Sequence, residues 1–209
     1  MSEITMMIPV EDFHLEALYE AGRGTEVAIL CHPHPLYGGD MNNNVVLALR
    51  AAMRKKRWGT LRFNFRGIGG SGGAYGEGEG ETEDVMAVAS HLLEQGCTVA
   101  CVAGYSFGAW IVLKAVRKGL EADSLVLISP PLDLLPFGDL NLPSGPCLVT
   151  LGDKDDFCGV ASLSKWVSSH SSSIPRVSIE LLAGCDHFYW NNEEKLVVKI
   201  TDFLDAHFG

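Results

Sequence analysis

The sequence of 209 residues lacks the features that direct a chain into or across a membrane. No run approaches the roughly 20 consecutive apolar residues that a membrane-spanning helix needs. Residues 1–10 include Glu3 and have no basic segment ahead of an apolar core, which is unlike a secretory signal peptide. We therefore expect no membrane partner and a cytoplasmic location.

Clustered positive charge is also scarce. The chain has 16 Lys and Arg against 26 Asp and Glu, a formal net charge of −10, whereas nucleic-acid binding needs grouped cations for the phosphates. The run Arg-Lys-Lys-Arg at residues 54–57 closes a helical pattern, where cations suit the negative end of the helix dipole. We expect no nucleic-acid partner.

The cysteines form no C-x-x-C pair, although there are six of them: Cys31, Cys97, Cys101, Cys147, Cys158 and Cys185. Most lie in apolar, strand-like runs, where a free cysteine behaves as a small buried hydrophobe. Without a secretory signal, this pattern predicts reduced thiols rather than a disulfide framework.

What the sequence does contain is an alternation of β-branched runs with helical patterns. The alternation predicts one α/β domain over residues 1–209, with a mostly parallel sheet of about eight strands and helices on both faces. Three extended runs joined by short turns, Ile4–Ile8, Phe13–Tyr19 and Val27–Cys31, predict an antiparallel meander that feeds this sheet. Later strands are expected at 60–65, 98–103, 124–129, 147–151 and 176–182. Helices are expected at 43–57, 81–95, 106–118, 160–169 and 193–207.

The pentapeptide Gly-Tyr-Ser-Phe-Gly at residues 104–108 follows the most apolar predicted strand and begins a predicted helix. In a chain with 23 glycines the bare pattern can arise by chance, but its setting between strand and helix is typical of a nucleophile elbow. There a serine occupies a tight turn, and the following helix stabilises negative charge. Ser106 is the predicted nucleophile, and the backbone N–H of Phe107 is a predicted oxyanion donor.

A serine hydroxyl needs a base and an acid, which such enzymes take from loops after later strands, in the order acid and then histidine. His187 follows a predicted strand in Gly-Cys-Asp-His-Phe and is the predicted base. Asp155 is the favoured acid because its spacing matches a Gly-x-x-Asp arrangement after the strand at 147–151. Other candidates for the acid are Asp153, Asp156 and Asp133.

The histidines His32 and His34 invite a metal interpretation, since paired histidines after a strand resemble ligands of metal-dependent amidohydrolases. That architecture needs an eight-stranded barrel, for which the chain is short. An H-x-H-x-D-H motif fails as well, because Leu36 stands at the aspartate position. We expect no metal site, and we expect both histidines to hydrogen-bond the loop backbone.

Gly67, Gly69 and Gly72 form a formal G-x-G-x-x-G, the fingerprint of a dinucleotide site. Such a site needs a helix that begins at these glycines, but the chain continues with further glycines and with carboxylates that repel a pyrophosphate. The segment is therefore interpreted as an irregular loop beside the site, and no cofactor is expected.

Taken together, these motifs resemble the α/β-hydrolase superfamily, specifically its small lidless members near the dienelactone hydrolase and carboxylesterase branch. The segments that carry the resemblance are CHPHPLYGGDMNNNVV, LRFNFRGIGGSGG, GEGETEDV, AGYSFGAW, LGDKDD and GCDHFYW. The resemblance implies a triad of Ser106, Asp155 and His187, with Phe107 as an oxyanion donor and no cofactor. Dienelactone hydrolases proper carry cysteine at the elbow, so a lactonase activity does not carry over.

In this fold the loop after the third extended run supplies a second oxyanion N–H. Prolines cannot donate, so the donor comes from His34, Leu36 or a neighbour, and we favour Leu36.

The substrate expected is a small ester-type acyl compound, because the segment Pro130–Gly145 is too short for a helical cap. Candidate pocket residues are His34, Tyr105, Leu135 and Phe188, with Phe188, Tyr189 and Trp190 at the rim. The apolar residues of Pro130–Gly145 are equally expected to line an acyl pocket or to pack over the edge of the sheet. A thioesterase or peptidase with the same triad, and a ligand-binding protein without activity, are the alternatives.

Overall fold

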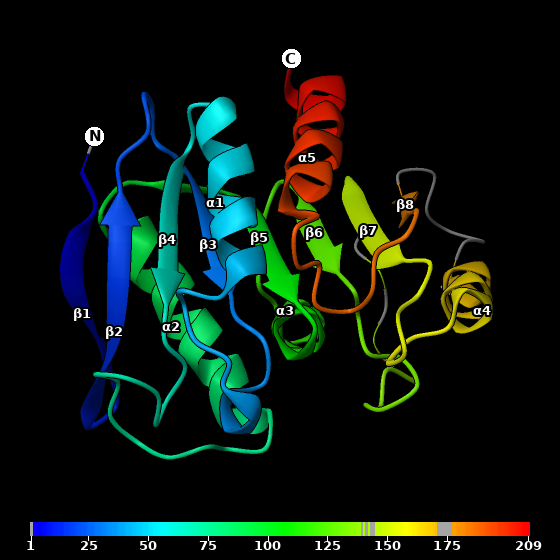
Figure 1. The fold of residues 1–209 in the computed structure, drawn as a ribbon. Coiled ribbons are helices and arrows are strands. Elements are labelled where there is room, and N and C mark those ends of the chain that lie inside the picture. Colours follow the sequence, from blue (N-terminus) through cyan, green and yellow to red (C-terminus); the bar gives the residue numbers. More distant parts are fainter. Residues whose placement is uncertain (1, 139, 141, 143–144, 171–176) are drawn as a thin grey trace.

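The computed structural model describes residues 2–138, 140, 142, 145–170 and 177–209, which form a three-layer α/β/α structure (Figure 1). The strands are β1 (Ile4–Val10), β2 (Phe13–Glu20), β3 (Glu26–Cys31), β4 (Gly59–Phe63), β5 (Thr98–Tyr105), β6 (Leu125–Ile128), β7 (Cys147–Gly152) and β8 (Val177–Leu182). The helices are α1 (Asn44–Lys55), α2 (Glu79–Glu94), α3 (Phe107–Arg117), α4 (Val160–His170) and α5 (Glu193–Phe208), with a short 3-10 helix, η1 (Pro35–Tyr37).

The described strands form one eight-stranded sheet in the order β1-β2-β4-β3-β5-β6-β7-β8. β1 and β2 pair antiparallel, and β2 pairs antiparallel with β4, while the strands from β4 through β3 to β8 run parallel. The expected mostly parallel sheet with antiparallel N-terminal strands is confirmed, and β5 lies near its centre.

The expected three-strand meander is wrong in one respect, because β3 does not pair with β2. It lies instead between β4 and β5 and is parallel to both. The reason is its burial. Ala28 and Leu30 pack under one helical layer and Val27, Ile29 and Cys31 under the other. A strand that is apolar on both faces suits the covered middle of a parallel sheet.

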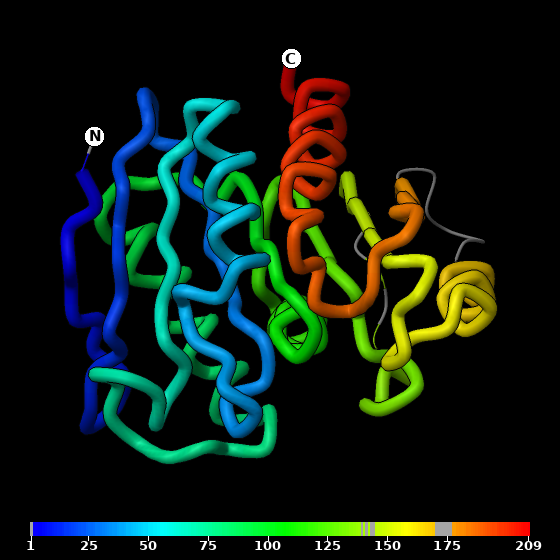
Figure 2. Tube along the Cα trace, in the orientation of Figure 1, coloured from blue at the N-terminus to red at the C-terminus, as the bar shows by residue number. Residues whose placement is uncertain are grey.

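Two helical layers bury the sheet (Figure 1). α1 and α5 pack on one face around Leu49 and Leu204. α2 and α3 pack on the other face around Val88 and Ile111, and Trp166 of α4 joins the same cluster. The parallel strands point downward in Figure 1, and Figure 2, in the same orientation, shows the chain turning below them in the loops after β3, β5, β7 and β8. The candidate site residues come from those loops.

Some element boundaries differ from the expected ones. α2 begins at Glu79 rather than at residue 81, because Gly78 has a positive φ of 89° and the Glu81 carboxylate accepts hydrogen bonds from the N–H groups of Gly76 and Gly78. β4 ends at Phe63 rather than at residue 65. Residues 171–176, which include the expected start of the last strand, lie outside the described residues.

All six cysteines lie in the described part of the chain and are free thiols, as expected, and five of them are buried. None of the described helices combines the length and apolar character of a membrane span.

Candidate active site

Ser106 lies at the turn between β5 and α3 with φ +54° and ψ −118°, a conformation that residues with a side chain rarely adopt. The turn is tight because both flanking glycines are in close contact with backbone. A Cβ on Gly104 would lie 2.3 Å from the carbonyl oxygen of Gly108, and one on Gly108 would lie 2.5 Å from that of Cys31. The two glycines therefore allow α3 to begin directly over the ends of β5 and β3, as the predicted elbow requires.

The structure brings together the three residues predicted as a triad. His187 Nε2 lies 2.9 Å from Ser106 Oγ, and His187 Nδ1 lies 2.9 Å from Asp155 Oδ2 and 3.0 Å from Oδ1. Because an ionised carboxylate only accepts hydrogen bonds, the imidazole donates from Nδ1 and accepts the serine hydroxyl at Nε2. This arrangement prepares the hydroxyl for removal of its proton.

The other carboxylates that competed for the role of acid have different contacts. Asp153 accepts a hydrogen bond from the Gly184 N–H, at 2.7 Å. Asp133 accepts from the Gly159 N–H, just before α4, and from the Ser162 hydroxyl in the first turn of α4. Asp156 is exposed, whereas the Asp155 side chain is fully buried against His187.

The acid loop and the histidine loop meet because β7 and β8 are parallel and end in register, Gly152 beside Leu182. A Cβ on Gly152 would lie 2.3 Å from the carbonyl oxygen of Cys185, so only glycine allows the two loops to touch. Lys154 N–H donates to that same carbonyl, at 2.9 Å. These contacts hold the loop that carries Asp155 against the loop that carries His187, at the carboxyl edge of the sheet.

The carboxylate of Asp155 is anchored on its own loop as well. Its Oδ1 accepts hydrogen bonds from the N–H groups of Phe157 and Cys158, at 2.8 and 3.2 Å. These bonds fix the orientation of the carboxylate toward His187 and balance its charge inside the protein.

The two predicted oxyanion donors differ in their surroundings. The N–H of Phe107 belongs to the first turn of α3, where amides have no acceptor within the helix. The N–H of Leu36 donates to His34 Nδ1, at 3.2 Å. The His34 ring in turn packs on the Phe107 ring, with centroids 4.7 Å apart, so the loop after β3 rests on the elbow. The role of Leu36 stays a prediction.

Both ring nitrogens of His32 take part in hydrogen bonds within the protein, which argues against the metal interpretation of the histidine pair. Nδ1 bonds the carbonyl of Pro33 at 2.6 Å, and Nε2 accepts from the N–H of Phe65 at 3.0 Å. Burial lowers the pKa of His32 to about 4, so the ring is neutral near pH 7. Burial also lowers the pKa of His34. Within the described residues, no three His, Cys, Asp or Glu side chains gather into a potential metal site.

The glycine-rich segment is an irregular loop whose amides bond within the protein rather than facing a phosphate. The N–H of Gly67 bonds the carbonyl of Gly72, and the N–H of Gly70 bonds the Glu16 carboxylate. Tyr75, which comes later in the same loop, places its hydroxyl 3.4 Å from His34 Nε2. The loop therefore packs beside the site, as the interpretation of the glycines predicted.

Aromatic rings surround the imidazole. The ring of Phe157 lies 4.5 Å from that of His187 and the half-exposed ring of Phe188 lies 5.7 Å from it, centroid to centroid. Phe157 was not among the site residues predicted from the sequence, although its position two residues after Asp155 could have indicated it. Trp190 is exposed, as expected of a rim residue.

Two of the expected pocket and rim residues, Tyr105 and Tyr189, are buried in the structure. Tyr189 is fully buried, and its hydroxyl lies 2.7 Å from Ser129 Oγ. Tyr105 is also buried, and its hydroxyl donates to the carbonyl of His187. Both rings point into the protein because the strand and loop that carry them are covered by α1 and α5. Leu135 is half-buried against the core, in agreement with the packing alternative.

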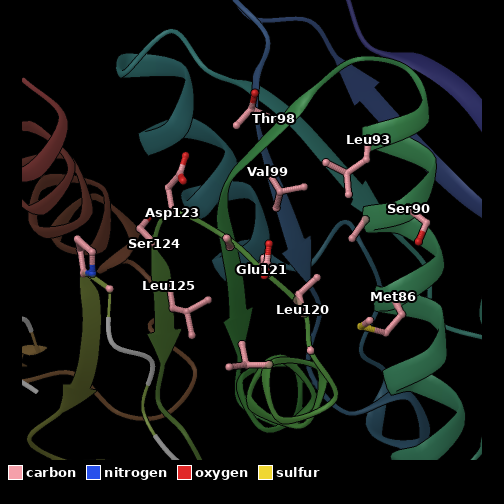
Figure 3. Close-up of a pocket in the computed structure, with 16 residues that line it drawn as sticks. Met86, Ser90, Leu93, Thr98, Val99, Leu120, Glu121, Asp123, Ser124 and Leu125 are labelled. Atoms are coloured by element: carbon pink, nitrogen blue, oxygen red, sulfur yellow. The ribbon is translucent and has the colours of Figure 1, made fainter. Parts of the chain in front are cut away.

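A hollow of about 700 Å³ lies away from these residues, among the starts of β5 and β6 and the ends of α2 and α3 (Figure 3). Its lining includes Thr98, Asp123 and Leu125, and none of the residues of the predicted triad. In parallel α/β sheets, ligands bind at the carboxyl ends of the strands, which is the opposite edge. The hollow is therefore not the acyl site.

An eight-stranded α/β sheet with a serine, histidine and carboxylate at its carboxyl edge defines the class of α/β serine hydrolases. No family model matches the chain. A curated relative, the uncharacterized protein RP471 of Rickettsia prowazekii (strain Madrid E), is 32% identical over 186 residues, which cover 85% of this chain and 78% of the relative.

Solved structures of α/β serine hydrolases are similar to this chain along nearly its whole length. An α/β serine hydrolase homologue from Coxiella burnetii is 31% identical, with a TM-score of 0.89 and 98% of each chain covered. XC6422 from Xanthomonas campestris, described as an α/β serine hydrolase without a lid, is 27% identical, with a TM-score of 0.89, 98% of this chain covered and 94% of that one. This chain belongs to the lidless α/β serine hydrolases of the α/β-hydrolase superfamily.

Proposed function

We propose that this hydrolase cleaves small ester-type acyl substrates through a covalent acyl-enzyme, with Ser106, His187 and Asp155 as its catalytic triad. The observation that carries the proposal is the continuous hydrogen-bonded chain from hydroxyl to imidazole to buried carboxylate, with 2.9 Å at each junction. Its order and its location after β5, β7 and β8 are those of the triad in this fold.

In the proposed mechanism, Ser106 Oγ attacks the ester carbonyl carbon while His187 Nε2 takes the hydroxyl proton. Asp155 holds the imidazole in the required tautomer and stabilises the imidazolium that forms. The N–H of Phe107 binds the oxyanion and contributes about 3 kcal/mol to lowering the barrier, and the N–H of Leu36 joins it once it leaves its acceptor, His34 Nδ1. The imidazolium then protonates the departing alcohol. Water, deprotonated by His187, attacks the acyl carbon, and the imidazolium then returns this proton to Ser106 Oγ as the carboxylic acid departs.

The connection between β6 and β7 supports a preference for short acyl groups. Only residues 129–146 join these strands, whereas a helical cap needs dozens of residues at this point. Without a cap, the rings of Phe157 and Phe188 beside His187 offer hydrophobic contacts to a substrate. An open site of this kind buries a short or medium acyl chain and leaves a long one in water.

Steady-state hydrolysis of p-nitrophenyl acetate, butyrate, octanoate and palmitate tests the proposal, with an acyl thioester and a peptide anilide assayed in parallel. We expect turnover of the short esters, decreasing kcat/KM at the longest chain, and loss of turnover in Ser106→Ala. Faster turnover of the thioester or the anilide would assign the same triad to another acyl bond. A folded protein that turns over none of them would contradict the proposal.

A further inference from the structure

The loop that carries His187 is held by side chains from outside that loop at three consecutive residues, 187–189. The Tyr105 hydroxyl, at the end of β5, donates to the carbonyl of His187 at 2.8 Å. The amide of Asn44, at the start of α1, donates from Nδ2 to the carbonyl of Phe188 at 3.0 Å. These bonds fix the backbone of the loop, not the imidazole, whose two nitrogens are already engaged.

The third contact fixes residue 189. The buried hydroxyl of Tyr189 lies 2.7 Å from Ser129 Oγ, at the end of β6. Tyr189 has a φ of +57°, a strained conformation for a bulky residue that persists only where surrounding contacts enforce it. Ser129 also has a positive φ, +44°. The loop is thus held in a conformation that it would not adopt unaided.

Both phenols are suited to a permanent structural bond. Tyr105 and Tyr189 are buried, and burial raises the pKa of each hydroxyl. Both groups therefore stay protonated across the pH range in which a histidine acts as a base. Tyr105 keeps a hydrogen to donate to the His187 carbonyl throughout.

We propose that Tyr105, Asn44 and the Ser129–Tyr189 pair are positioning residues that hold His187 between Ser106 and Asp155; this inference rests on the proposed function. A general base must meet both partners at hydrogen-bond distance, and a displacement of about 1 Å costs about 100-fold in rate. Hydrogen bonds to β5, α1 and the end of β6, in addition to the chain connections to β8 and α5, oppose displacement of the loop.

Tyr105 contributes most directly, because it is the residue before Ser106. Its backbone continues into the elbow, and its side chain holds the carbonyl of His187, so one residue fixes the distance between the nucleophile turn and the base loop. Its ring also packs against the imidazole, with centroids 5.4 Å apart. Replacing only the hydroxyl leaves this packing in place and isolates the hydrogen bond.

The experiment compares Tyr105→Phe with Tyr19→Phe, a matched change on β2 far from the site. For p-nitrophenyl butyrate we expect Tyr105→Phe to lower kcat about 10- to 100-fold with KM within about twofold, and Tyr19→Phe to match the wild type. In a His187→Ala background, Tyr105→Phe should cause no further loss, because it acts through the missing imidazole. An equal further loss in that background would overturn the proposal.

A second measurement needs no substrate and separates this inference from the proposed function. The proton between His187 Nδ1 and Asp155 gives a low-field ¹H NMR resonance in a fixed pair, and we expect it to broaden or move in Tyr105→Phe and in Asn44→Ala, but not in Tyr19→Phe. Asn43 caps α1, so Asn44→Ala leaves the helix start in place. An unchanged resonance and unchanged kcat in both variants would overturn the positioning role, whereas an inactive wild type with a shifted resonance would overturn only the proposed function.

Discussion

At the scale of single residues, the proposed proton transfer involves Ser106 as donor, His187 as acceptor and Asp155 as the group that orients the imidazole. Each imidazole nitrogen has a separate partner, and Asp155 is itself fixed by two backbone N–H groups. The sequence places three carboxylates within four residues after β7, at 153, 155 and 156. Burial distinguishes them, since only the side chain of Asp155 is enclosed against the base.

Asp155→Asn should lower kcat about 10³- to 10⁴-fold, because the amide stabilises the wrong imidazole tautomer and cannot compensate the imidazolium. The matched control is Asp156→Asn, which changes the neighbouring exposed carboxylate. Ester hydrolysis measured for both folded variants checks this. Comparable losses in the two variants would remove Asp155 from the role of acid.

His32 predicts a dependence of stability on pH. Burial lowers its pKa to about 4, whereas an exposed histidine has a pKa of about 6.5, so the unfolded chain binds more protons below about pH 6.5. The contribution of this site to the free energy of unfolding is complete above that pH and is lost as the pH falls toward 4. Between pH 7 and pH 5 the loss is about 2 kcal/mol.

Urea unfolding at the two pH values measures this contribution. The fall in the free energy of unfolding from pH 7 to pH 5 should be smaller by about 2 kcal/mol in His32→Gln than in the wild type. His14→Gln, which changes an exposed histidine, should retain the full wild-type fall. An undiminished fall in His32→Gln would show that His32 is not responsible.

At the scale of secondary-structure elements, the decisive contact is the crossing of α3 over β3 at Gly108. A methyl group there would lie 2.5 Å from the carbonyl oxygen of Cys31 and 2.7 Å from that of His32, both on fixed backbone. Gly108→Ala should therefore lower the free energy of unfolding by about 1–3 kcal/mol through overpacking. Gly138→Ala is the control, since its added carbon has no atom within 4 Å among the described residues outside its own chain neighbours. Chemical denaturation that ranks the two variants equally would contradict this view of the elbow.

The types and approximate bounds of the elements could be predicted from the sequence because they depend on local periodicity. The pairing of β3 could not, since the order of strands depends on which ones have both faces covered. That Ser106, Asp155 and His187 come together could be predicted from their order in the chain, after β5, β7 and β8. The hydrogen bond of Tyr105 could not be predicted, because the residue type between the glycine and the serine of the motif does not indicate a hydroxyl that bonds a residue 82 positions away. Tyr189 was expected at the rim because the sequence likewise does not indicate that its hydroxyl is buried beside Ser129 Oγ.

At the scale of the whole molecule, two hydrophobic clusters lie on opposite faces of one sheet, and central strands such as β3 contribute side chains to both. Neither cluster can lose its sheet face without exposing the other. We therefore predict that residues 1–209 unfold as one cooperative domain. Tryptophan fluorescence and far-ultraviolet circular dichroism should give coincident urea transitions. Two separated transitions would show that the two layers are independent units.

The central claim is that Ser106 is a nucleophile activated by His187. Intact-protein mass spectrometry after reaction with a fluorophosphonate tests it without knowledge of the substrate. The account predicts one adduct on Ser106 in the wild type, no adduct in Ser106→Ala, and labelling slowed at least about 100-fold in His187→Ala, since the general base contributes that much. An unlabelled folded wild type, or an adduct that survives in Ser106→Ala, would contradict it.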